Sequence, residues 1–161
     1  MTPATFWVKL YDLDFKPGAP LKKLTPTATP ETQAKKHTVV AGTDNAFKWA
    51  AKYHVKLAWG TDLMFNAAQM KNQNTDIPKL LSWFTSAQAL QLVTRDNAEL
   101  LALSGPRNPY PGRLGVVEEG ALADLLLVDG DPIGNIKLIE DPAKNFLVIM
   151  KDGNIYQNLI K

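Results

Sequence analysis

The longest patterned stretch of the chain runs from residue 30 to residue 54. Small, apolar or aromatic positions recur there at intervals of three and four residues, the spacing of one helix face: Val40, Thr43, Phe47, Ala50 and His54. Thr29 can cap such a helix, Pro30 suits its first position, and Glu31 favours its positive end. We therefore predict a helix over residues 30–54, with a strand at 38–42 ("TVVAG") as the alternative.

The next stretch, "VKLAW" at residues 55–59, is short and apolar, follows the predicted helix and is closed by Gly60. This pattern is typical of a buried strand in an α/β protein. Gly-Thr-Asp occurs twice, ending at Asp44 and at Asp62. The helix prediction makes Asp44 a surface acid. Asp62 instead follows the end of the predicted strand, where α/β folds collect ligands and catalytic groups, so Asp62 is the candidate site residue.

Residues 76–103 show helical spacing again. We predict one short helix at 77–84 ("IPKLLSWF"), a second that begins at Thr85 with Gln88 completing a capping box, and a third capped by Thr94. Four of the apolar positions are expected to face a core: Leu90, Val93, Ala98 and Leu101.

The pattern changes after about residue 105. Residues 104–122 are rich in turn formers, and "ADLLLV" at 123–128 then predicts a strand. "FLVIMKDGNIYQN" at 146–158 predicts a β-hairpin, because Asp152-Gly153 suits a type I′ turn. The chain therefore divides into an α/β part at 1–105 and a β-rich part at 106–161.

Composition narrows the class of protein. The chain has 161 residues, 45% of them apolar and 21% charged, with a net charge of +2, which fits a soluble globular protein. It contains no cysteine, which excludes disulfides and thiolate metal sites. We expect no nucleic-acid partner, because basic residues are not clustered with aromatic ones. Neither a membrane-spanning run nor a signal peptide is visible, so we expect no membrane partner and leave the compartment unknown.

Several motifs in a fixed order carry a resemblance to a known family. "KLAWGTD", "VTRDNAELLAL", "GRLGVVEEGALADLLLVDGDPIGNI" and "VIMKDGNIY" together resemble the C-terminal portion of a metal-dependent amidohydrolase of the imidazolonepropionase-like or prolidase-like branch. The resemblance implies an α/β fold: the C-terminal part of a distorted (β/α)8 TIM barrel, followed by strands of a small composite β-sandwich. It also implies zinc (Zn2+) as the metal, with Asp62 as a metal ligand and as the catalytic group that takes the proton from the bridging water.

The other metal ligands of that family have no counterpart here. The two histidines, His37 and His54, both fall in the predicted helix and on different faces, so we expect surface or packing roles for them. Asp76 and Asp96 have no His partner at ligand spacing. A catalytic zinc needs about three protein ligands and a barrel takes about 250 residues, so both counts fall short.

We therefore expect an incomplete barrel: a fragment of a hydrolase that acts on amide, cyclic amide or dipeptide C–N bonds. Its substrate would be a small amide or dipeptide, and the chain alone would be inactive and bind no zinc. Its partner would be a second copy, by self-association, or a missing N-terminal half. The alternative is a non-catalytic remnant or interaction module that pairs through exposed β edges. Arg107, Asn108 and Tyr110 could line a site or could simply be turn residues. Trp59 is expected in the core and Asn66 as a loop cap.

Overall fold

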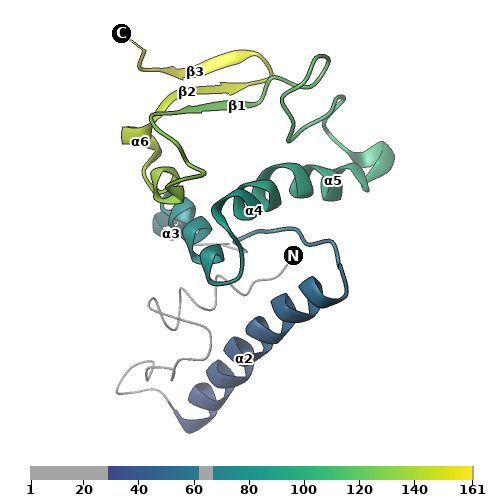
Figure 1. Ribbon diagram of the computed structural model, residues 1–161, viewed down its shortest axis with the longest axis vertical. Coiled ribbons are helices and arrows are strands. Elements are labelled where there is room, and N and C mark those ends of the chain that lie inside the picture. Colours follow the sequence, from purple (N-terminus) through teal and green to yellow (C-terminus); the bar gives the residue numbers. More distant parts are fainter. Residues whose placement is uncertain (1–28, 62–66, 161) are drawn as a thin grey trace.

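The computed structural model describes residues 29–61 and 67–160. It combines a set of helices with a small open sheet (Figure 1). The long helix α2 lies at one end of the molecule and the sheet at the other, with α4 and α5 between them. Asp62 and Asn66 lie outside the described residues, so the structure does not test their predicted roles.

Helix α2 spans Pro30–Lys52 and confirms the predicted helix, which ends two residues earlier than expected. Its start is fixed as the sequence predicts, because the Thr29 hydroxyl accepts a hydrogen bond from the Thr32 N–H at 3.2 Å. The predicted helix face is buried, except that His54 lies beyond the helix, exposed and at φ 53°. His37 is exposed on α2.

The helices that follow form one winding path. Helix α3 (Ala67–Lys71) leads to the 3-10 helix η1 (Gln73–Ser82), and α4 (Ser86–Gln91) continues through a π-helical turn, η2 (Leu92–Asp96), into α5 (Asn97–Ala102). The capping box at the start of α4 is confirmed: the Thr85 hydroxyl accepts from the Gln88 N–H, and the Gln88 side chain accepts from the Thr85 N–H at 2.9 Å.

The prediction that Thr94 caps a separate helix is wrong. Its hydroxyl donates a 2.7 Å hydrogen bond to the carbonyl of Leu90, one turn earlier in a helix that does not stop. A threonine can bond back to the preceding turn as readily as cap the next one, and the choice depends on whether the backbone continues. Here it continues through η2, so α4 and α5 form one helical unit.

The sheet has three strands in the order β1-β2-β3, both pairs antiparallel: Leu125–Val128, Phe146–Lys151 and Asn154–Asn158. Asp152 and Gly153 join β2 to β3 with φ values of 49° and 73°, the positive pair that a type I′ turn requires. The predicted strand at 123–128 and the predicted hairpin are therefore confirmed. The remaining short helices are η3 (Gly105–Arg107), η4 (Ile136–Glu140) and α6 (Pro142–Asn145).

A single cluster of buried residues connects the helices to the sheet: Phe47, Ile77, Leu80, Ala89, Leu92, Ile136, Ile139 and Phe146. Leu90 and Val93 pack against it, as predicted. Leu101 does not: its side chain is 42% exposed, so its predicted core position is wrong. The π turn adds a residue to one helical turn, so the spacing that places Leu90 and Val93 on the core no longer places Leu101 there.

The segment from Val55 to Thr61 is not a strand, so the prediction for residues 55–59 is wrong. Its side chains do alternate as predicted: Leu57 and Trp59 pack against the core cluster, whereas Lys56 is exposed. A strand also requires a neighbouring strand to pair with, and the described part of the chain supplies none beside this segment.

Candidate functional site

The approach to Asp62 is held in place by one side chain, Asn97. Its carbonyl oxygen accepts a hydrogen bond from the Trp59 N–H at 2.8 Å, and its amide nitrogen donates to the Trp59 carbonyl at 3.0 Å. The same nitrogen lies 3.4 Å from the Val93 carbonyl in the preceding turn. A side-chain amide therefore satisfies both backbone groups of Trp59, as a neighbouring strand would. The segment leading to Gly60 and Thr61 is fixed against the start of α5.

Asn97→Ala is expected to cost about 2 kcal/mol of unfolding free energy, because both half-buried backbone groups of Trp59 lose their partner. Asn97→Asp keeps the acceptor for the Trp59 N–H and loses the donor to its carbonyl, so we expect a smaller loss. Urea unfolding gives the free energies, and amide exchange reports the Trp59 N–H directly.

Asn108→Ala is the matched control for this prediction, because the Asn108 side chain bonds only locally, to the Tyr110 N–H at 3.2 Å. It should leave the exchange rate of the Trp59 amide unchanged. Equal exchange of that amide in the wild-type chain and in Asn97→Ala would contradict the assigned role of Asn97.

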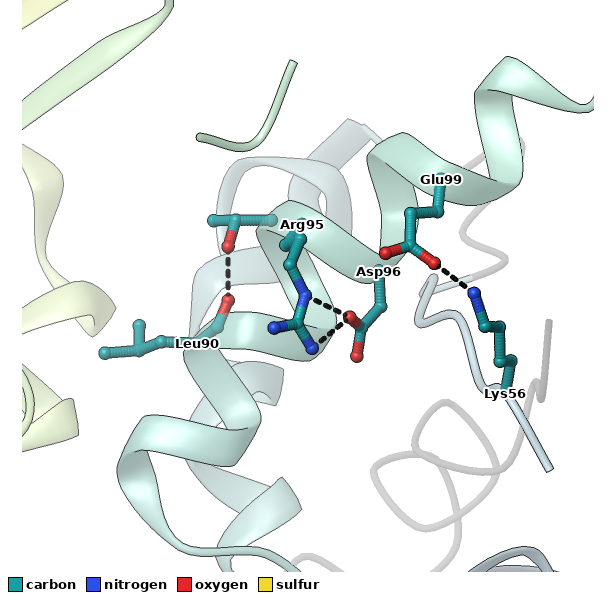
Figure 2. Close-up of polar contacts among 6 residues, drawn as sticks. Lys56, Leu90, Arg95, Asp96 and Glu99 are labelled. Atoms are coloured by element: carbon teal, nitrogen blue, oxygen red, sulfur yellow. Dashed lines mark hydrogen bonds and ion pairs between the residues drawn. The ribbon is translucent and has the colours of Figure 1, made fainter. Parts of the chain in front are cut away.

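Two ion pairs flank the same segment (Figure 2). The Lys56 ammonium lies 2.6 Å from the Glu99 carboxylate, and the Arg95 guanidinium lies 2.9 Å from the Asp96 carboxylate. The hydrogen bond and the charge of Lys56 hold the pKa of Glu99 below its usual value, and Glu99 in turn raises the pKa of Lys56. Glu99 therefore stays ionised at neutral pH and is poorly suited to act as a general acid.

A hollow of about 400 Å³ adjoins these ion pairs. Its wall combines the four charged side chains with an apolar group made of Leu57, Ala58, Leu100 and Leu103. Each charge already has an opposite partner, so the hollow presents apolar surface between two neutralised pairs.

The second Gly-Thr-Asp has a structural role. Asp44 lies in α2, as predicted, but its side chain is half-buried and accepts hydrogen bonds from Lys48 Nζ at 2.6 Å and Trp83 Nε1 at 3.0 Å. These two hydrogen bonds lower the pKa of the Asp44 carboxyl. The carboxylate therefore ties α2 to the end of η1, and the surface prediction for this residue needs that correction.

The other polar residues named from the sequence do not come together. Asp76 is buried, with one carboxylate oxygen 3.0 Å from Lys79 Nζ. Within residues 29–61 and 67–160, no three His, Asp or Glu side chains are grouped closely enough to hold a metal ion.

Two further outcomes concern the loop and the core. The hydrogen bond between Asn108 and Tyr110 supports the interpretation of these loop positions as turn residues. Trp59 packs on the core as predicted, and its buried Nε1 has no hydrogen-bond partner among the described residues.

Sequence reasoning missed Asn97, although a signal was present. "TRDNAELLAL" reads as a continuous helix, and an asparagine inside a helix is unfavourable because its side chain competes for backbone hydrogen bonds. Its partner, Trp59, is 38 residues away, a separation that no local pattern can reveal.

Comparison with known proteins identifies the fold. An amidohydrolase structure matches with a TM-score of 0.65 and 28% identity, over 83% of this chain and 30% of that one. A prolidase complexed with N-methylphosphonate-L-proline matches with a TM-score of 0.68 and 23% identity, over 98% and 34%. An ochratoxinase from A. niger matches with a TM-score of 0.68 and 21% identity, over 98% and 31%. No protein-family model and no curated protein matches the sequence.

The chain therefore has an amidohydrolase-superfamily fold, which confirms the resemblance seen in the sequence. It spans about a third of the length of the solved structures that it matches. Within the described residues, no helix combines the length and the apolar character that crossing a membrane requires.

Proposed function

We propose that this chain is the Asp62-bearing part of a metal-dependent hydrolase that acts on amide, cyclic amide or dipeptide C–N bonds. The observation that carries the proposal is the likeness in fold to an amidohydrolase, a prolidase and an ochratoxinase. The arrangement around Trp59 supports it, because Asn97 fixes the backbone three residues before the candidate ligand. In this proposal residues 1–105 are part of an incomplete barrel and residues 106–161 belong to a composite sandwich.

The residues of this chain do not by themselves fit a zinc ion. Zinc in a catalytic site takes about three protein ligands, usually with histidine among them. The described residues contain no such group, and both histidines are exposed, one on α2 and the other beyond its end. Asp62 alone would be one carboxylate, so we assign no chemical step to the isolated chain. The remaining ligands would come from another polypeptide.

The alternative function is an interaction module without catalysis. The apolar side chains of β1 and β3 favour it, because Leu126, Ile155 and Tyr156 are all more than half exposed. Surface of this kind on edge strands invites pairing with another chain.

Zinc content tests the proposal. The isolated chain is expected to hold less than about a tenth of an equivalent, because one carboxylate does not make a site. The chain should be purified alone and then together with the part of the matching amidohydrolase that it does not cover. The complex is expected to approach one equivalent of zinc for the wild type, and much less for Asp62→Asn.

Asp44→Asn is the matched control, since Asp44 ends the other Gly-Thr-Asp and is engaged by Lys48 and Trp83. A complex that binds as much zinc with Asp62→Asn as with the wild type would contradict the role of Asp62. A complex without zinc would favour the interaction module.

A further inference from the structure

We propose that residues 56–58 form a strand-accepting segment, which an extended β-strand of another polypeptide occupies. That polypeptide corresponds to the two-thirds of the matching structures that this chain does not cover. The inference goes beyond the proposed function, because it requires neither a metal nor a reaction.

The first observation is a set of backbone groups without partners. In the described part of the chain, the N–H and C=O groups of Lys56, Leu57 and Ala58 make no hydrogen bond. On either side of them the backbone is held, by Val55 N–H to the Ala50 carbonyl at 2.9 Å and by Asn97 to Trp59. Half-buried backbone groups in folded proteins nearly always find partners, so a pinned stretch without them is ready to pair.

The second observation is open space beside this stretch. The hollow of about 400 Å³ described above includes Lys56, Leu57 and Ala58 in its wall. Another, of about 300 Å³, also borders Lys56 and Leu57 and extends toward α2 and α4. A β-strand added to the segment would lie about 4.8 Å from it, which requires free volume of this kind.

The third observation concerns the side chains that an added strand would meet. Leu100 and Leu103 border the larger hollow and are exposed, Leu103 by 82%. The nearby charges are paired within the chain, Lys56 with Glu99 and Arg95 with Asp96. The segment therefore favours an uncharged, apolar strand over a charged peptide, and the affinity would come from main-chain hydrogen bonds.

The identity of the occupant follows from length. The matching amidohydrolase, prolidase and ochratoxinase share the fold of this chain over 30%, 34% and 31% of their own lengths, so most of their polypeptide lies outside it. That polypeptide is the source of strands that the comparison provides. A second copy of this chain is the competing occupant, and the experiment separates the two.

The experiment uses the full chain and, as probe, the part of the matching amidohydrolase that lies outside the covered region. Amide exchange is measured with and without the probe, and binding is measured by calorimetry. On complex formation we expect slower exchange at Lys56, Leu57 and Ala58. Ala58→Pro, which removes an N–H and disfavours strand pairing, is expected to weaken binding about tenfold or more. Ala58→Val keeps the N–H and should bind like the wild type.

Exchange of the Trp59 amide shows whether Ala58→Pro remains folded, and the protection pattern in the wild-type chain does not depend on that variant. Three outcomes would overturn the inference: no complex, a complex whose protection is confined to the sheet, or equal affinity for Ala58→Pro. Protection at 56–58 that grows with the concentration of the chain alone would assign the segment to a second copy and overturn the proposed occupant. Zinc plays no part in these measurements, so an inactive, metal-free complex would still support the strand-accepting segment.

Discussion

Leu80→Ala is expected to destabilise the chain by about 3 kcal/mol, within the range for emptying a fully buried leucine position. Leu80 has no exposed surface and lies in η1, within the cluster that joins α2, the central helices, η4 and β2. That cluster contains eight buried residues, and Leu80 is among the largest of the fully buried side chains. Because single domains are stable by only about 5–15 kcal/mol, the loss should be visible as a large drop in the urea midpoint.

The neighbouring residue provides the control. Leu81 has the same side chain but is 45% exposed, so truncating it leaves no closed cavity. We expect Leu81→Ala to cost less than about 1 kcal/mol. Equal losses for the two variants would mean that the cluster around Leu80 is not the core of the folded chain in solution.

Gly115→Ala is expected to have a comparable effect, about 3 kcal/mol, for a different reason. Gly115 has φ +74°, and a Cβ there would lie 2.7 Å from the Arg95 Cα and 2.8 Å from the Thr94 carbonyl oxygen. Both obstacles are backbone atoms of the π turn, so no side-chain rotation relieves the clash. The loop at 104–122 would have to move away from η2, and thermal unfolding should detect the change.

Gly120→Ala separates the clash from the backbone penalty. Gly120 also has positive φ, +82°, but no atom lies within 4 Å of the added Cβ position. Only the left-handed conformation is then penalised, at about 1 kcal/mol. If Gly115→Ala were no more harmful than Gly120→Ala, the close approach of this loop to the π turn would be contradicted.

The features that could be predicted from the sequence are those decided by neighbouring residues. The capping box at Thr85 and Gln88, the Thr29 cap of α2 and the Asp152-Gly153 turn each depend on a few adjacent side chains and on the φ angles that they allow. The buried face of α2 follows from spacing alone. In such places the chain offers its backbone one favourable conformation, and distant contacts do not alter it.

The predictions that fail depend on distant parts of the chain. The apolar pattern of residues 55–59 does orient Leu57 and Trp59 toward the core, but pairing requires a strand that the described residues lack. Thr94 could have capped a helix, and the continuing backbone decided otherwise. The same limit applies to the candidate site. Its approach can be traced to Trp59 and Asn97, whereas Asp62 itself remains a prediction.

The π turn between Leu92 and Asp96 also makes the chain sensitive to changes in length at that point. An α-helix advances by about 100° for each residue, so deleting one residue here would restore a regular helix and rotate α5 by about that angle relative to α4. Asn97 would then leave Trp59, although every side chain outside the deletion kept its identity. Substitutions within these five residues are far milder, because they leave the number of residues in the turn unchanged.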